Sequence, residues 1–553
     1  MDTARLNRPH AAGIGLLSVG VALAAGHLFA GFTDPGASPY LAVGNTAIDL
    51  APPWLKDFAV STFGTKDKPV LLAGMAVVIA IFGAVAGLVS ARRPLPGSIL
   101  LGVLGVLGVL AVLKRPDLGQ LAPLVPAASL VAGVLTFTWL HGKALDAARE
   151  AGYEAARHLP DRPDRYLAGE RPAGERPASE RPASERPAGE RPAGERPADP
   201  ARRGLLVAAG ATVAGAGVAA LTGQLLGNRV DVQASRRAVG TIRPAVAAAA
   251  IPPGADFAAA GTPSFITPNE AFYRIDTALV VPRVRAESWS MRVHGMVDRE
   301  LRLRYDDLRN RELVERTVTL TCVSNEVGGP YISTANFVGV PLRAVLDEAG
   351  VQAGADQLVS RSVDGWSCGS PTEVMLDADR AMLALAMNGE PLPAEHGFPV
   401  RLVTAGLYGY VSATKWLADL ELSTFDAFTP YWAKRGWARR APIKTMSRID
   451  RPGAFQRVPA GRTVIAGVAW AQHRGIEAVE VRLDRGQWRE ATLATEVNLD
   501  TWRMWRLDVD VAKGGHTVEV RATDKIGYTQ TDKRADPVPD GATGWHSVSF
   551  SAT

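Results

Sequence analysis

Long apolar runs with almost no charge occupy much of the first 230 residues, and the composition after that point is mixed. Five of these runs are long enough, or nearly so, to cross a bilayer as a helix, which takes about 20 residues. They are 11–31, 69–91, 97–113, 120–140 and the Ala/Gly-rich 204–226. The sequence therefore predicts a membrane region, with four transmembrane helices in 1–145 and a fifth at 204–226, followed by globular domains.

Arginine pairs beside these runs predict the orientation of the chain. Arg5 and Arg8 precede the first run, Arg92 and Arg93 follow the second, and Arg202 and Arg203 precede the fifth. Cytoplasmic loops carry an excess of Lys and Arg, so five spans that start from a cytoplasmic N-terminus place all three pairs inside. We expect a multi-pass protein of the cell membrane, held in the lipid bilayer, with an extracytoplasmic C-terminal globule. A four-span arrangement with the globule inside is the alternative.

Residues 146–203 contain six consecutive five-residue units that each carry one Glu, one Arg and one Pro. Their charges cancel and their prolines exclude a helix, so we expect a disordered cytoplasmic linker. The weakly hydrophobic run after Arg202 and Arg203 resembles a twin-arginine export signal, and an ordinary membrane anchor is the alternative. Twin-arginine export moves folded proteins, so it suits a domain that receives a cofactor before crossing.

Cys322 and Cys368 are the two cysteines among 553 residues. In the stretch around TLTCVSNEVGG (319–329), the period of two places Val318, Leu320 and Cys322 on one face of a strand. The thiol then lies where the strand gives way to a loop, a common place for a site. Three interpretations are open: a small buried hydrophobe, a disulfide with Cys368, and a thiolate ligand of a soft metal.

The stretch HGFPVRLVTAGLYGYVSATKW (396–416) combines cations and hydroxyls around a glycine-containing loop. His396 and Arg401 flank a short apolar strand, and Ser412, Thr414 and Lys415 follow it. Such groups can form a cradle for an anion such as phosphate. No Walker-type or dinucleotide glycine pattern is present, so a nucleotide is not the favoured occupant. The net charge of +5 is small for this length, so we expect no nucleic-acid partner.

Five segments occur in the order and spacing of the sulfite oxidase family of molybdopterin-dependent oxidoreductases. They are TPNEAFYRID (267–276), TLTCVSNEVGG (319–329), MNGEPLP (387–393), HGFPVRLV (396–403) and GYVSATKW (409–416). The tail, with 465–488 and GWHSVSF (544–550), is similar to the immunoglobulin-like domain of that family. The resemblance implies an α+β molybdopterin domain over 255–435, followed by an all-β immunoglobulin-like sandwich of the dimerisation type over 440–553.

By this resemblance Cys322 gives its thiolate to molybdenum, whose other sulfurs come from the pterin dithiolene. The residues implied to contact the Mo-molybdopterin cofactor are Cys322, Asn269, Tyr273, Arg274, Asp364, His396, Arg401, Ser412, Thr414 and Lys415. Those implied to be catalytic are Cys322, Asp364 and Cys368. The implied chemistry is oxygen-atom transfer to or from a small substrate, followed by electron exchange with a separate redox partner.

The chain also departs from the family pattern. Sulfite-oxidising members carry Arg-Asn-His where this chain reads Arg274-Ile275-Asp276, and their pocket tyrosine falls at Ser367 or Cys368. Their arginine before the terminal Trp-His is absent before His546. A pocket that binds an anion needs such groups. A sulfoxide, including methionine sulfoxide, is therefore as acceptable a substrate as sulfite.

The sequence also predicts which partners to expect. There is no Cys-x-x-Cys-His or cytochrome b5-like segment. His27 lies near the outer end of the first predicted span and His141 near the inner end of the fourth, so we predict no haem in this chain. The immunoglobulin-like tail makes a homodimer a further expectation. The alternative to an enzyme is a membrane-anchored surface module that carries a Cys322–Cys368 disulfide.

Overall fold

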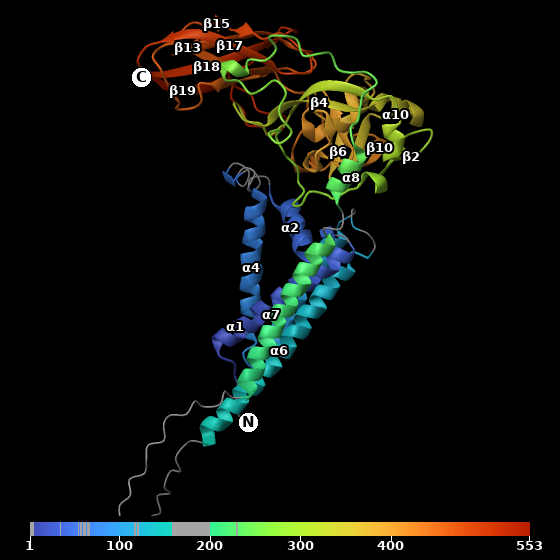
Figure 1. The fold of residues 1–553 in the computed structure, drawn as a ribbon, viewed down its shortest axis with the longest axis vertical. Helices are drawn as coiled ribbons and strands as arrows, with labels where there is room; N and C mark the ends of the chain where they lie inside the picture. The colour runs from blue at the N-terminus through green and yellow to red at the C-terminus, as the bar shows by residue number, and fades with distance from the viewer. Residues whose placement is uncertain are drawn as a thin grey trace, which may run out of the picture. The chain divides into compact units, whose positions relative to one another are not determined.

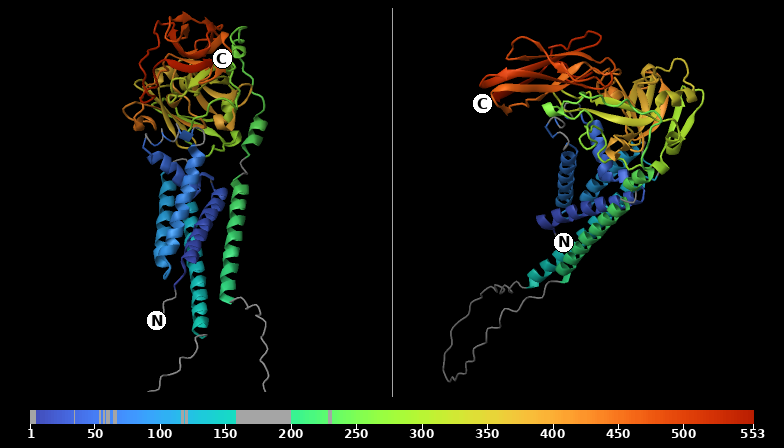
Figure 2. Two further views of the ribbon diagram at one scale, coloured as in Figure 1. Left: turned by 90° about the vertical axis from the view of Figure 1, so that its left-hand side faces the viewer. Right: turned by 45° about the horizontal axis from the view of Figure 1, so that its top comes forward.

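The computed structural model describes residues 5–33, 35–52, 55, 58, 62–63, 67–115, 118, 121–157, 200–227 and 231–553. The chain divides into two compact units (Figure 1; Figure 2). The first consists of helices within 1–47, 59–114 and 118–227, and the second is built mainly on 228–553. The boundary falls where the sequence changes from apolar runs to mixed composition.

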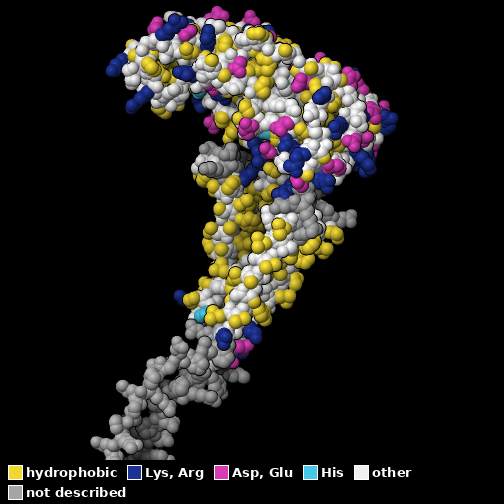
Figure 3. Space-filling view, in the orientation of Figure 1, with side chains coloured by type: hydrophobic (Ala, Val, Ile, Leu, Met, Phe, Trp, Pro, Cys, Tyr) yellow, Lys and Arg dark blue, Asp and Glu magenta, His cyan; other side chains and the backbone are white. Residues whose placement is uncertain are grey.

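Five helices of the first unit are long and apolar enough to cross a membrane, as predicted. They are α1 (Arg8–Phe32), α4 (Asp67–Val89), α5 (Leu95–Leu113), α6 (Leu124–Arg157) and α7 (Pro200–Gly227). A short helix, α2 (Pro39–Leu50), was not predicted. Within this unit α1 contacts α4, α6 and α7, and Figure 3 shows the apolar side chains that cover the long helices.

The predicted linker begins later than expected, because α6 runs on to Arg157. Residues 146–157 read DAAREAGYEAAR, which is rich in the strong helix formers Ala, Glu and Arg and contains no proline. This part of the predicted linker is therefore helical. The Glu-Arg-Pro repeat lies outside the described residues, and α7 begins after it at Pro200.

The second unit begins with α8 (Val232–Val239) and continues with two sheets. One has the strand order β2-β1-β10-β5-β6, and the other has the order β3-β4-β7-β8 with β9 paired to β7. The strands are β1 (Ser290–Gly295), β2 (Leu301–Arg304), β3 (Val314–Thr321), β4 (Ile332–Pro341), β5 (Gln357–Ser362), β6 (Ser367–Pro371), β7 (Ala381–Met387), β8 (Glu390–Pro391), β9 (Arg401–Thr404) and β10 (Leu417–Ser423). Short helices α9 (Tyr305–Arg309), α10 (Leu342–Ala349) and α11 (Thr372–Met375) connect them. The mixture of strands and short helices agrees with the predicted α+β domain.

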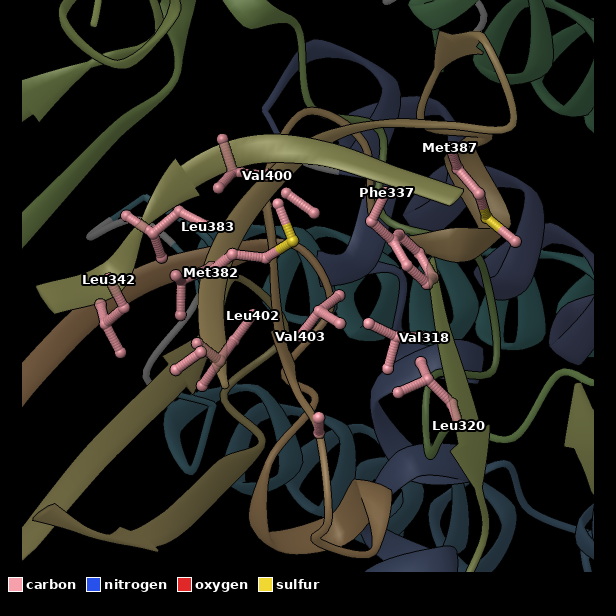
Figure 4. Close-up of a cluster of buried hydrophobic side chains, with 14 of the residues drawn as sticks. Val318, Leu320, Phe337, Leu342, Met382, Leu383, Met387, Val400, Leu402 and Val403 are labelled. Atoms are coloured by element: carbon pink, nitrogen blue, oxygen red, sulfur yellow. The ribbon is translucent and has the colours of Figure 1, made fainter. Parts of the chain in front are cut away.

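One face of β3 packs into the core of this domain. Val318 and Leu320 are buried on the same face, as the period of two predicted, and they lie with Phe337 in the cluster shown in Figure 4. The threonines between them, Thr317 and Thr319, are also buried. Both faces of the strand that leads to Cys322 are therefore covered.

The rest of the chain forms two further sheets, here named the C-terminal β domain (446–552). Their strand orders are β11-β13-β17-β16 and β12-β19-β18-β14-β15. The strands are β11 (Met446–Arg451), β12 (Arg457–Val458), β13 (Gly461–Trp470), β14 (Ile476–Leu483), β15 (Arg489–Glu490), β16 (Thr492–Leu493), β17 (Arg503–Val511), β18 (Gly514–Asp524) and β19 (His546–Ala552). Side chains of both sheets, among them Ile465, Trp505 and Val520, share one hydrophobic core.

Candidate active site

Cys322 follows β3 directly and opens the loop 323–330. Its N–H donates to Tyr331 O at 3.0 Å, and Ser324 Oγ lies 2.9 Å from its Sγ. Burial raises the pKa of the thiol, while the hydrogen bond with Ser324 and the charge of Lys415 act in the opposite direction. Nearby cations and donors favour the thiolate, the form that binds metals. Both cysteines are free thiols, so the disulfide alternative is wrong.

Two tyrosines lie within electrostatic range of this thiol, and a glycine lies close to the end of β3. Burial raises the pKa of the Tyr273 phenol, Cys322 raises it further, and Arg401 acts against them. Burial likewise raises the pKa of Tyr408, with a smaller contribution from Cys322. A Cβ on Gly409 would lie 3.9 Å from both Tyr273 Oη and Thr321 O. The glycine loop therefore passes the end of β3, and both phenols stay protonated hydrogen-bond donors at neutral pH.

Arg401 is a buried cation at the start of β9. Its side chain is 5% exposed, its Nε has no hydrogen-bond partner, and no ion pair joins it to a carboxylate in the described part of the chain. Burial lowers its pKa to about 10, and Tyr273 acts in the opposite direction. A buried charge without a partner is costly. The guanidinium is therefore suited to hold an anion.

Lys415 and Arg274 share one buried carboxylate. Lys415 Nζ donates to Asp276 Oδ2 at 2.7 Å, and Arg274 Nε donates to the same oxygen at 2.9 Å. Burial lowers the pKa of Lys415 to about 8, against the effect of Asp276. Asp276 thus offsets part of the positive charge that Arg274, Arg401 and Lys415 bring to the site.

His396 is buried and held by Asn269. Its Nε2 donates to Asn269 O at 3.0 Å, and because a carbonyl only accepts, that nitrogen carries the proton. Burial, with Arg401 and Lys415, lowers the pKa of the ring to about 3. The ring is therefore neutral and leaves Nδ1 as an acceptor. The Asn269 amide donates to Glu390 Oε1 and accepts from Asn388 Nδ2, which fixes this segment.

Three of the predicted residues make side-chain hydrogen bonds within the protein. Ser412 Oγ donates to Leu407 O and Tyr408 O, so its hydroxyl shapes the glycine loop. Thr414 Oγ1 lies 2.6 Å from Ser360 Oγ, beside the fully buried Cys368. Asp364 accepts from Trp366 N in the turn between β5 and β6. Contact of these three residues with the cofactor stays a prediction.

Three residues of the site escaped the sequence reasoning. Asp276 was noted as a departure from a pattern, but its pairing with Lys415 depends on a contact across 139 residues. Tyr408 sits inside the glycine loop that was singled out, and Ser324 follows Cys322 by two positions. A search for polar side chains near Cys322 could have found Ser324. No sequence signal pointed to Tyr408.

Comparisons with known proteins identify relatives of this part of the chain. Residues 278–432 match the family described as oxidoreductase molybdopterin binding domain. Sulfite oxidase of Gallus gallus is 31% identical over 322 residues, which cover 49% of this chain and 69% of that protein. The uncharacterized oxidoreductase YuiH of Bacillus subtilis is 32% identical over 152 residues, 28% of this chain and 73% of that protein. Mitochondrial sulfite oxidase of Homo sapiens is 29% identical, over 52% of this chain and 62% of that protein.

The chain therefore belongs to the sulfite oxidase family of molybdopterin-dependent oxidoreductases, and its cofactor is molybdopterin. It spans 62% of the length of the human relative. The site fits the cofactor, because the unpaired Arg401 and the neighbouring Lys415 suit an anionic phosphate, and a cysteine thiol suits molybdenum. When bound, the cofactor supplies two-electron redox chemistry at the metal.

Proposed function

We propose that this chain is a membrane-anchored, extracytoplasmic oxidoreductase that transfers an oxygen atom to or from a small substrate, with Cys322 as the molybdenum ligand. The observation that carries the proposal is a free thiol at the end of β3, within electrostatic range of Tyr273 and Lys415, with Arg401 within the same range of Tyr273. Cations and hydrogen-bond donors around a thiol favour its ionised form. The two electrons that the metal exchanges with the substrate pass to, or come from, a separate redox partner.

The surrounding residues would bind and orient the cofactor. Arg401 and Lys415 would hold its anionic phosphate, and Arg274 would stay in place through Asp276. His396 would accept a hydrogen bond from the pterin at Nδ1, because Asn269 O already takes the Nε2 proton. Contacts of Ser412 and Thr414 with the pterin and its phosphate belong to the same proposal. Asp364 as a cofactor contact and Cys368 as a substrate-pocket residue remain predictions.

A sulfoxide, including methionine sulfoxide, is the second candidate substrate, and Asp276 favours it. Its carboxylate accepts from both Arg274 and Lys415. Once the cofactor's own negative charge is added, little positive charge is left for an anion such as sulfite. A neutral sulfoxide does not need that charge.

Elemental and pterin analysis of the purified chain tests the proposal. We expect about one molybdenum and one pterin per chain, with turnover of a sulfoxide, sulfite or both, since one thiolate provides one metal site. Steady-state assays with sulfite and with methionine sulfoxide then choose between the substrates. A chain expressed with adequate molybdate that carries neither metal nor pterin would overturn the proposal.

The proposed location rests on the three arginine pairs that flank the spans. We propose that Arg202 and Arg203 belong to a twin-arginine signal, because a domain loaded with its cofactor must cross the membrane folded. Replacing both by lysine should then leave the second unit in the cytoplasm, as measured by protease access from outside. Normal exposure of that variant would reduce the pair to an orientation signal.

The two-sheet C-terminal β domain is proposed to be an immunoglobulin-like sandwich that supports a homodimer. The shared core of the two sheets supports the sandwich architecture. Light scattering of the detergent-solubilised chain, corrected for detergent, would give the number of chains per particle.

A further inference from the structure

The strand that leads to Cys322 lies at the edge of its sheet. In the order β3-β4-β7-β8, β3 pairs on one side with β4. Its start is covered by a bridge between Val314 and Val246. A strand edge with unpaired N–H and C=O groups is normally covered or blunted. The rest of this edge, up to the threonine before Cys322, is covered by the C-terminal β domain.

Two segments of that domain contact the edge. Thr319 N donates to Asp500 O at 2.9 Å, and Trp502 N donates to Thr319 Oγ1 at 2.8 Å. The Asn498 amide donates to Thr317 O at 3.0 Å. From the other segment, Gln472 Nε2 donates to Thr319 O at 3.1 Å and to Thr321 Oγ1 at 3.0 Å. Gln472 therefore contacts the residue that directly precedes Cys322.

The same domain also holds the loop after the thiol. Arg448 donates through a guanidinium N–H to Gly329 O at 3.0 Å. His546 lies directly against Gly328, where a Cβ would come within 2.2 Å of Nε2. Cys322 is thus fixed from both sides, by the strand before it and the loop after it, and each is held by residues more than one hundred positions further along the chain.

Among the residues of the C-terminal β domain that contact β3, Gln472 is the one whose presence is hardest to explain by stability alone. The side chain is 1% exposed, and its Oε1 has no hydrogen-bond partner. A buried polar atom without a partner costs stability, and an apolar side chain of similar size would avoid that cost. What an apolar side chain could not provide is the pair of hydrogen bonds that Gln472 donates to Thr319 and Thr321 of β3.

We propose that Gln472 is a positioning residue for the molybdenum ligand, so that the C-terminal β domain takes part in setting the geometry of the metal site. The inference rests on the proposed function, in which Cys322 is the ligand. A shift at Thr321 displaces the adjacent thiol, because the two residues are consecutive in the backbone. Partners outside the ligand set orient ligands, and their loss typically costs about 10–100-fold in metal affinity or activity.

The test compares Gln472→Leu with Gln530→Leu in the full chain purified in detergent. Gln530 is a matched control, since it is also buried in the C-terminal β domain, but its bonds to Ser447, Ala522 and Gly544 stay within that domain. Gln472→Leu should lower kcat about tenfold, change KM less than about twofold and shift the electron paramagnetic resonance spectrum of Mo(V). Gln530→Leu should lower thermal stability and leave the spectrum unchanged.

A second measurement needs no metal. In chain produced without pterin, iodoacetamide should alkylate Cys322 several times faster in Gln472→Leu than in Gln530→Leu. Trypsin separates the two thiols, because Cys322 lies between Arg316 and Arg343 and Cys368 lies between Arg361 and Arg380. If Gln472→Leu does not fold, Thr321→Val removes the hydroxyl that Gln472 contacts and should give a smaller effect in the same direction.

The outcomes separate the two proposals. Equal spectra and equal alkylation rates in the Gln472 and Gln530 variants would overturn the positioning role. Cys322→Ser that keeps the wild-type Mo(V) spectrum would overturn ligation by Cys322, and with it the proposed function. A lost spectrum in Cys322→Ser together with a silent Gln472→Leu would leave ligation standing and reject the inference alone.

Discussion

Cys368 is fully buried and Cys322 is half-buried, each lies next to a serine, and burial raises the pKa of both thiols. Their surroundings differ in charge and in backbone position. Cys368 lies inside β6 among the hydroxyls of Ser370, Ser360 and Thr414, and its pKa is raised to about 11. Cys322 lies after a strand, beside Lys415 and close to the phenol that Arg401 also faces. Exposure, a nearby cation and a position at a loop therefore distinguish Cys322, the proposed molybdenum ligand, from Cys368.

The largest expected effect comes from replacing each of the two cysteines by serine. Cys322→Ser should lower turnover by more than about 100-fold, the upper end of what losing a partner outside the ligand set costs, and change the molybdenum spectrum. Cys368→Ser should keep activity within about tenfold and leave the spectrum intact. Metal analysis and steady-state assays of both variants measure this. Equal losses in the two variants would remove the distinction.

Replacing Arg401 should weaken cofactor binding but stabilise the chain that lacks the cofactor. Arg401→Met should weaken molybdopterin binding about 10–100-fold, because an anion-binding group is lost. The same change should stabilise the cofactor-free chain by about 1–3 kcal/mol, since a buried unpaired charge is removed. Pterin content and chemical denaturation of both forms test it. A destabilised cofactor-free variant would mean that Arg401 has a partner of its own.

The negative charge of Asp276 tests whether the site selects its substrate by charge. Asp276→Asn should raise kcat/KM for sulfite relative to methionine sulfoxide about tenfold, because Arg274 and Lys415 then act as uncompensated cations. Lys415→Met with the same assay is the control, and it should move the ratio in the other direction. An unchanged ratio would show that substrate charge is not selected at this place.

The smallest expected effect concerns pH. His396 has a pKa of about 3 in the folded chain, below its value of about 6.5 in an unfolded one, so the unfolded state binds the proton first. Its contribution to stability is present above pH 6.5 and is lost as the pH falls toward 3. Between pH 6.5 and 5.5 this should take about 1 kcal/mol from the free energy of unfolding. His396→Gln should lessen the slope by that amount in denaturation followed by tryptophan fluorescence, while His546, whose pKa burial lowers to about 4, keeps its own share. A slope that His396→Gln leaves unchanged would assign it to other groups.

Part of the site could be predicted from short stretches of sequence. The strand period placed Cys322 beyond Leu320 on a buried face, and the cation-rich loop marked Arg401 and Lys415. The hydrogen bonds of the hydroxyls could not be predicted in the same way. Ser412 turns back on its own loop and Thr414 joins Ser360, because buried hydroxyls take whichever acceptor the packed chain places next to them.

The sequence by itself determined the division into apolar helices and a globular unit, the family, and the position of a thiol at the end of a strand. These depend on local patterns: the length of apolar runs, the period of two, and ordered motifs. Only the tertiary structure decided that Asp276 neutralises Lys415, that Arg401 lacks a carboxylate in the described part of the chain, and that Gln472 holds the strand before Cys322. Such contacts join residues more than one hundred positions apart, and folding rather than local pattern brings them together.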